Sequence, residues 1–311
     1  MTVTLYVIIC GAVLTFIVAS VARSVRYARN PIHLRWEVYP VPHEPRDRVR
    51  HGGSYFESSE WWRTPRRPSL LGDLKFMIPE MLLLRALRES NRPLWRRSFP
   101  FHAGLYLLAV AAGLLLLAAV AMMAGVTSRT GTIAQWLGWL YTTAGAAGLV
   151  LTVSGAIALL HRRLTDPALR VLTTPGDVFN LLFFVAAFGL AGLGYLARPA
   201  GSPGALAIVM GLLSWDSTRP VPPLLGCGLA AVALLVAYIP LTHMSHFIAK
   251  YFTYHRVRWD DAPLAGNRRT AAAMASYLAY RPTWAADHMK AGGAGTWAEI
   301  VSSNPTCEEK R

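Results

Sequence analysis

Five long runs of apolar residues divide the chain, and none of them contains Lys, Arg, Asp or Glu. A bilayer core of about 30 Å is crossed by about 20 residues of α-helix, so each run is long enough to span it. The sequence therefore predicts an all-α integral membrane protein built as a bundle of five transmembrane helices. The runs lie at residues 3–21, 99–124, 133–160, 178–197 and 221–248.

Polar segments separate the first run from the other four and follow the last one. Within the first polar segment, apolar residues recur at helical spacing from Leu74 to Leu87. Charged residues and Pro79 interrupt this stretch, which is too polar to span. We expect an amphipathic helix at the membrane interface or under a partner, or else a small packed loop domain. The predicted parts are a first transmembrane helix (1–22), a loop with the amphipathic helix (23–98), a four-helix membrane part (99–249) and a tail (250–311).

The basic residues indicate how the helices are oriented. With the N-terminus outside, the inner segments hold 16, 3 and 9 Lys and Arg residues, against Arg129, Arg198 and Arg219 in the outer loops. Short cytoplasmic loops are enriched in basic residues. We therefore expect a multi-pass protein of the cytoplasmic (inner) membrane, with a cytoplasmic first loop and C-terminal tail. No basic residue precedes the first run, which favours a retained helix over a signal peptide.

Composition agrees with a membrane protein, since only 15% of residues are charged against about 25% in soluble domains. The net charge of +14 comes from segments between apolar runs, and no nucleic-acid-reading motif accompanies it, so we expect no nucleic-acid partner. Cys10, Cys227 and Cys307 form no Cys-x-x-Cys pair. This argues against a four-thiolate zinc or iron–sulfur site within the chain. Any iron–sulfur cluster is expected on another subunit.

Two histidines are placed to face each other inside the membrane. His102 stands near the start of the second run and His246 near the end of the fifth. These helices run in opposite directions, so both imidazoles come to the same depth in the cytoplasmic leaflet. A polar ring in hydrocarbon needs a partner, and two facing imidazoles can ligate a haem iron. His243 is the alternative to His246, because residues three apart share a helix face. Interfacial histidines bonded to backbone or water remain the other interpretation.

Several stretches resemble the cytochrome b (gamma) subunit family of respiratory nitrate reductase. The resemblance is closer to the related membrane subunits of sulfur-metabolism complexes, which pair with heterodisulfide-reductase-like iron–sulfur proteins. It covers about residues 99–258 in order and spacing, and segments 33–44 and 281–299 are similar to the sulfur-metabolism branch only. The stretches are Ser98-Phe-Pro-Phe-His102-Ala-Gly-Leu, Gly155-Ala-Ile-Ala-Leu-Leu-His-Arg162-Arg163-Leu-Thr-Asp-Pro167, Thr173-Thr-Pro-Gly-Asp177 and Pro240 to His246.

The resemblance implies five transmembrane helices and a role in respiratory electron transport. The chain would be the electron-transfer subunit of a quinol oxidoreductase complex, with no complete active site of its own. It would exchange electrons between a quinone, expected to be menaquinone, and an iron–sulfur partner on the cytoplasmic face. The resemblance also implies that His102 and His246 ligate haem b. A haem-free membrane anchor for a soluble oxidoreductase is the alternative function.

One departure from the family changes the expected cofactor content. The positions that ligate the family's second, outer haem hold Ala112 and Gly228 here, and neither can donate to iron. We therefore expect a single haem b. Quinone is then expected near the inner haem, with Tyr39 and His43 as candidate quinone-binding residues.

Overall fold

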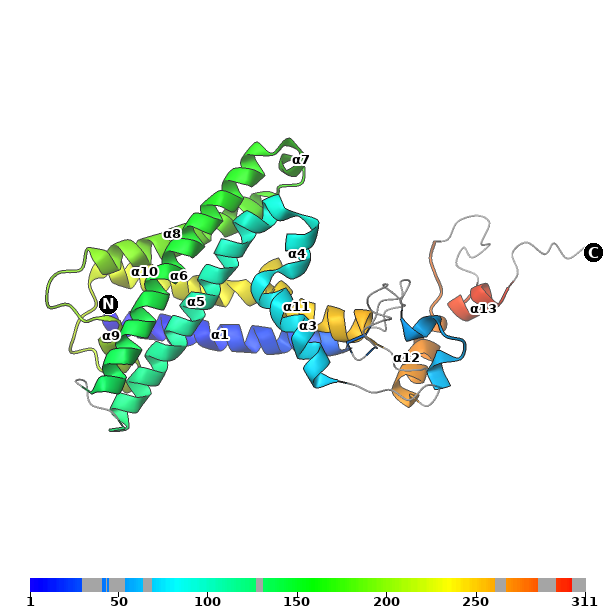
Figure 1. Ribbon diagram of the computed structural model, residues 1–311, viewed down its shortest axis with the longest axis horizontal. Coiled ribbons are helices and arrows are strands. Elements are labelled where there is room, and N and C mark those ends of the chain that lie inside the picture. The colour runs from blue at the N-terminus through cyan, green and yellow to red at the C-terminus, as the bar shows by residue number, and fades with distance from the viewer. Residues whose placement is uncertain are drawn as a thin grey trace, which may run out of the picture. The chain divides into compact units, whose positions relative to one another are not determined.

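The computed structural model describes residues 1–29, 41–42, 44, 54–63, 69–126, 131–260, 267–284 and 295–303. All regular elements among them are helices (Figure 1). Five spans are long and apolar enough to cross a membrane, which confirms the prediction of a multi-pass helical protein. They are α1 (Thr2–Arg29), α5 (Arg92–Met123), α6 (Thr132–Thr165), α8 (Pro175–Leu196) and Pro223–Leu241, which joins α10 (Pro223–Tyr238) to the 3₁₀ turn η3 (Ile239–Leu241).

The chain divides into two compact units. The first, here called the bundle unit, comprises Met1–Arg23 and Leu74–His246, and the second comprises Ser24–Asp73 and Phe247–Arg311. His102, His243 and His246 all belong to the bundle unit. The shorter elements are η1 (Tyr55–Glu57), η2 (Trp61–Arg63), α3 (Leu70–Leu83), α4 (Arg85–Ser90), α7 (Pro167–Arg170), α9 (Ala205–Ser214), η4 (His243–Ser245), α11 (His246–Thr253), the π-helix η5 (Tyr254–Arg258), α12 (Arg268–Leu278) and α13 (Trp297–Ser302).

Close helix packing in the bundle unit depends on glycine. Helix α5 packs along α6, and α8 packs on both α6 and α10. A Cβ atom at Gly155 of α6 would lie 2.5 Å from the backbone nitrogen of Phe101, and one at Gly148 would lie 2.9 Å from backbone atoms of α5. Small residues let helix backbones approach in this way. The glycines of α6 thereby hold the first half of α5 in place.

A cluster of apolar side chains fills the space between α5, α6, α8 and α10. Phe101 and Phe184 meet edge to face, with ring centroids 4.9 Å apart and planes at 81°. Leu235 of α10 is buried in the same cluster. Since Phe101 directly precedes His102, this packing also sets where the His102 backbone lies.

Helix α5 begins earlier than its apolar run. The sequence predicted a start at residue 99, with His102 in the first turn, but the helix starts at Arg92. The Asn91 side chain accepts a hydrogen bond from the Leu94 backbone N–H at 3.0 Å, and Pro93 lies at the second helical position. Both are helix-start signals. His102 therefore lies in the third turn.

The last span is broken where the sequence predicted a continuous helix to residue 248. Helix α10 ends at Tyr238, and two 3₁₀ turns follow before α11 begins at His246. Pro240 has no backbone N–H to continue the helix. Thr242 is extended (φ −116°, ψ −176°), and its hydroxyl accepts a hydrogen bond from the Met244 N–H at 3.3 Å. His246 is thus the first residue of a new helix and not part of the last turn of the span.

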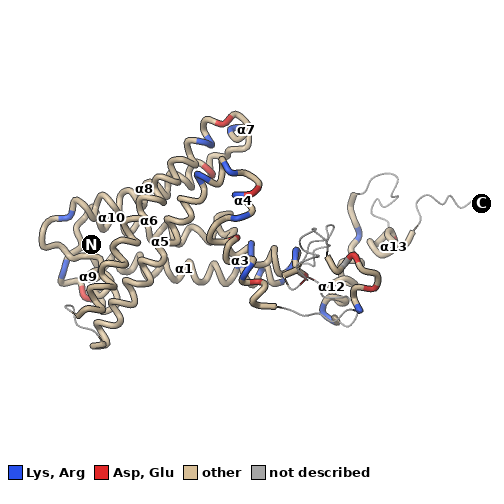
Figure 2. The backbone as a smooth tube through the Cα atoms, in the orientation of Figure 1, with Lys and Arg blue, Asp and Glu red and all other residues tan. Residues whose placement is uncertain are grey.

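Arginines mark one end of the bundle unit, here called the basic end (Figure 2). At this end α5 begins, α6 ends and α8 begins. Helix α3 is fixed against the start of α5: the Tyr106 hydroxyl donates to the Met81 carbonyl at 2.7 Å, and the Trp95 indole N–H donates to the Leu83 carbonyl at 2.8 Å. The arginines on α5 and α6 at this end are Arg92, Arg96, Arg97, Arg162 and Arg163.

Candidate functional site

His102 of α5 and His246 of α11 lie with their imidazole rings side by side in the bundle unit. Their ring centroids are 6.1 Å apart and the ring planes are inclined at 67°. The residues are far apart in the sequence, and the antiparallel course of α5 and the last span brings them together. Their juxtaposition is the one that the sequence analysis anticipated, although α11 begins at His246 and α5 starts two turns earlier than predicted.

The spacing of the two rings fits a metal ion between them. A metal–imidazole bond is about 2 Å long, and a ring nitrogen lies about 1 Å from its ring centre. Two imidazoles on opposite sides of one metal ion therefore have centroids roughly 6 Å apart. The observed 6.1 Å matches this value. A haem iron with two axial histidines is the membrane cofactor that needs this arrangement.

The His102 ring is oriented by the preceding turn of its own helix. Its Nδ1 atom lies 2.8 Å from the Ser98 carbonyl oxygen and 3.3 Å from the Ser98 hydroxyl. A carbonyl oxygen only accepts, so Nδ1 carries the proton and the neutral ring has its lone pair on Nε2. Metal-ligating histidines commonly bond a backbone carbonyl through their other nitrogen, which fixes the ring and raises its basicity. Residue Ser98 thus supports a ligand role for His102.

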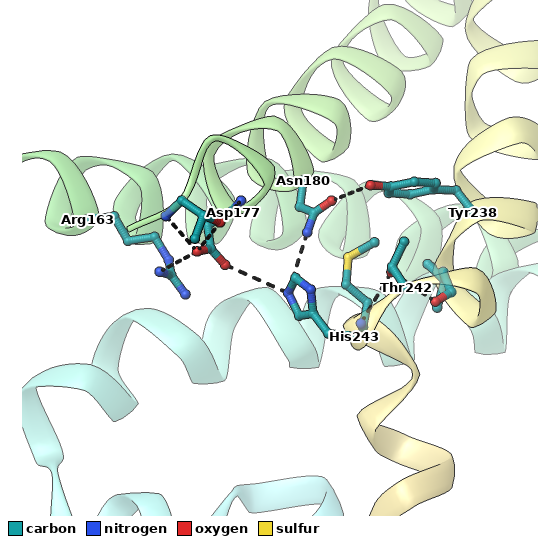
Figure 3. A network of polar contacts seen from close by, with 9 residues as sticks. Arg163, Asp177, Asn180, Tyr238, Thr242 and His243 are labelled. Atoms are coloured by element: carbon teal, nitrogen blue, oxygen red, sulfur yellow. Dashed lines mark hydrogen bonds and ion pairs between the residues drawn. The ribbon is translucent and has the colours of Figure 1, made fainter. Parts of the chain in front are cut away.

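His243, the alternative to His246, lies in a separate polar network (Figure 3). Its Nε2 atom is 3.8 Å from Asp177 Oδ1 and 3.5 Å from Asn180 Nδ2. Both partners come from the first two turns of α8. The structure therefore pairs His102 with His246 and directs the Nε2 atom of His243 toward α8.

Helices α6, α8 and α10 all contribute to this network. The Asp177 carboxylate accepts hydrogen bonds from the Thr174 N–H at 3.0 Å and the Thr174 hydroxyl at 2.8 Å, which completes a capping box at the start of α8. Arg163 Nη1 lies 3.6 Å from the same carboxylate. The buried Asn180 side chain accepts a hydrogen bond from the Tyr238 hydroxyl at 2.9 Å. The His243 imidazole thus lies beside the Asp177 carboxylate, which the helix cap fixes, and the Asn180 amide, which Tyr238 fixes.

The sequence alone predicted no role for this network. Asp177 belongs to one of the stretches that carry the family resemblance, and neither Asn180 nor Tyr238 was predicted as a site residue. A signal was present, because Asp177 and Asn180 are three residues apart at the start of an otherwise apolar run and therefore share a face of α8. The break at Pro240, which turns His243 toward that face, was needed to complete the pattern.

The remaining candidate positions are Tyr39, His43, Ala112 and Gly228. Tyr39 and His43 lie outside the described residues. Ala112 is exposed on α5. A Cβ atom at Gly228 of α10 would lie 2.5 Å from the Ala191 backbone nitrogen of α8. Position 228 is therefore closed to any side chain while α8 and α10 pack as they do.

No protein-family model, curated protein or solved structure matches this chain. Within the described ranges, no group of three or more His, Cys, Asp or Glu side chains is placed to hold a metal ion.

Proposed function

We propose that this chain is a haem b membrane subunit of a respiratory quinone/quinol oxidoreductase complex, with His102 and His246 as the axial ligands of one haem b. The observation that carries the proposal is the pair of imidazole rings 6.1 Å apart, one from a membrane-spanning helix and one from the helix that follows the last span. The Ser98 carbonyl, which sets the His102 ring, supports it further.

Haem suits the exchange between quinones and iron–sulfur proteins, because it carries single electrons while a quinol releases two. The chain's own residues have three tasks. His102 and His246 would hold the iron, and the hydrogen bond from His102 Nδ1 to the Ser98 carbonyl would tune the donor strength of that ring. The apolar cluster around Phe101 and Phe184 would exclude water from the side of the His102 ring that faces Phe101, 5.3 Å away between ring centroids. Axial ligands and burial together set the potential of such a cofactor.

We propose one haem per chain, because the positions that would ligate a second haem in the family that the chain resembles hold alanine at 112 and a closely packed glycine at 228. Helix α5 rises by about 1.5 Å per residue, so its far end at Met123 lies roughly 30 Å from His102 along the helix. With no second haem to bridge that distance, electrons from a quinol at the far end would not reach the iron rapidly. We therefore place the quinone reaction at the basic end, where His102 and His246 lie.

The partner is proposed from charge. By the order of the spans along the sequence, the segments on one side hold 28 of the 31 Lys and Arg residues, which supports a cytoplasmic location for the basic end. We propose that an iron–sulfur protein of the heterodisulfide-reductase-like type docks on that face and that menaquinone is the membrane carrier. Part of the basic surface would instead contact anionic lipid headgroups. In this arrangement the chain transfers electrons and has no complete active site of its own.

An absorption spectrum of the purified protein tests the proposal. We expect reducible b-type Soret and alpha bands, lost in His102→Ala and in His246→Ala. His161→Gln, which changes an exposed histidine of α6, is the matched control and should retain both bands. A wild-type protein without these bands would favour the alternative, a haem-free anchor for a soluble oxidoreductase.

A further inference from the structure

We infer that His243, Asp177 and Asn180 form the subsite for the quinone headgroup, with Nε2 of His243 exchanging a proton with a hydroquinone hydroxyl. This inference rests on the proposed function and adds the site and the proton-handling group to it. The candidates that the sequence suggested, Tyr39 and His43, lie outside the described residues.

The subsite lies close to the histidine pair along the chain. His243 precedes His246 by three residues, and three residues of fully extended chain span at most about 11 Å. The two 3₁₀ turns around Pro240 keep this segment compact. A headgroup bonded to His243 is therefore within a distance over which electrons pass rapidly to an iron held by His246. Among the described residues, no histidine stands at the far end of α5, which lies roughly 30 Å from His102 along the helix.

The surroundings of His243 Nε2 suit both protonation states of the ring. The Asn180 carbonyl oxygen accepts from Tyr238 at 2.9 Å, so its amide nitrogen is the group turned toward His243, 3.5 Å away. That N–H donates to a neutral ring with its lone pair on Nε2. After protonation, Nε2–H is a donor, and Asp177 Oδ1 at 3.8 Å provides the opposite charge. The amide contact is long, so a hydroquinone hydroxyl can replace the Asn180 N–H at the single lone pair of Nε2.

His243 is much more exposed than the two residues beside it, Asp177 and Asn180. The His243 side chain is 69% exposed, whereas that of Asp177 is 16% exposed and the residue Asn180 only 6%. Two of these interactions have a structural explanation: Asp177 caps α8, and Asn180 bonds Tyr238. Neither explains why the carboxylate and the amide both lie next to the exposed His243 imidazole. A ligand arriving from the lipid would meet the imidazole first.

The reaction balances with partners already named. A hydroquinone loses two hydroxyl protons and two electrons, its two C–O bonds become C=O bonds, and quinone results. The proton of the hydroxyl bonded to His243 moves to Nε2 and then to water at the basic end, and the other hydroxyl proton goes directly to water. A haem held by His102 and His246 would take up the two electrons one at a time, and the iron–sulfur partner of the proposed function would be their acceptor. In the opposite direction His243 donates the proton.

Binding of a hydroxyquinoline N-oxide, a fluorescent quinol analogue, tests this subsite without turnover. We compare the wild-type holoprotein with His243→Gln, with Asp177→Asn, which keeps an acceptor for the helix cap, and with the control His161→Gln. We expect at least a tenfold weaker affinity in His243→Gln and a smaller loss in Asp177→Asn, with wild-type affinity in the control. Reduction of the haem by menadiol should slow in parallel, while dithionite reduces all four proteins fully.

Each outcome decides the inference. Unchanged affinity for the N-oxide and unchanged reduction by menadiol in His243→Gln would overturn it, and the haem spectrum would leave the proposed function standing. Loss of haem in His243→Gln would make His243 an iron ligand and overturn both the subsite and the role of His246. A wild-type protein that holds haem and binds no N-oxide would also overturn the subsite alone.

Discussion

Gly228 of α10 packs directly on the backbone of Ala191 in α8, so closely that a Cβ atom would lie 2.5 Å from the Ala191 nitrogen. The same position would have to carry a histidine if the chain held a second haem in the manner of the family it resembles. The close contact between α8 and α10 leaves no room for a histidine side chain at position 228.

The first prediction concerns haem stoichiometry. We expect one haem b per chain, because only His102 and His246 among the described residues stand with their rings at the spacing that a single iron requires. The pyridine haemochrome assay on purified protein of known concentration measures this ratio. A ratio of two would contradict the single-haem proposal and our interpretation of Gly228.

The second prediction concerns the fit of α8 against α10. Gly228→Ala places a methyl group in the Ala191 backbone, and overpacking of this kind costs about 1–3 kcal/mol. We expect a lower midpoint for thermal unfolding in detergent. Gly113→Ala on α5, where nothing lies within 4 Å of the new Cβ, is the control and should unfold as the wild type does. Equal midpoints in the two variants would mean that α8 and α10 are not packed as described.

The third prediction links helix packing to the cofactor. Gly155→Ala would push α5 away from α6 at Phe101, whose backbone nitrogen lies 2.5 Å from the added Cβ position. Because His102 follows directly, we expect reduced haem occupancy as well as reduced thermal stability. The control is Gly138→Ala on the same helix, where the nearest atom is 3.8 Å away. Full haem occupancy in Gly155→Ala would show that the position of His102 does not depend on this contact.

The fourth prediction tests the bond between Tyr238 and Asn180. Tyr238→Phe removes the donor and leaves a buried amide oxygen without it, which costs about 1–3 kcal/mol. With Asn180→Leu already in place, the same change should cost much less, since neither partner then remains to be satisfied. Thermal unfolding of the two single variants and the double variant gives the coupling energy. Additive effects would show that the bond contributes little to stability.

The fifth prediction concerns the second unit. Glu44 is buried, and its carboxylate accepts hydrogen bonds from Val41 N–H at 3.0 Å, the Ser54 hydroxyl at 2.7 Å and Tyr55 N–H at 3.0 Å. Glu44→Gln puts an amide donor against one of these donors, with a cost of about 1–3 kcal/mol. Limited proteolysis should cut faster within residues 41–63, while the haem spectrum stays unchanged. Wild-type cleavage rates would show that these bonds do not hold the segment.

Hydropathy alone was enough to predict the five spans, because each depends on the composition of a local run of residues. Their ends were predicted less well. The cap at Asn91 and the break at Pro240 were visible in the sequence, but apolar runs continue across helix breaks and stop before helix starts. Caps and prolines, more than hydropathy, therefore determine where α5 begins and α10 ends.

By itself the sequence determined that the protein is helical and membrane-spanning, and it predicted matching depths for His102 and His246. Only the tertiary structure decided that these two rings lie 6.1 Å apart while His243 joins Asp177 and Asn180. The reason is that hydropathy and helical periodicity are local properties, readable from neighbouring residues. Which side chains meet across helices depends on glycine contacts and on the broken backbone at Pro240, which combine distant parts of the chain.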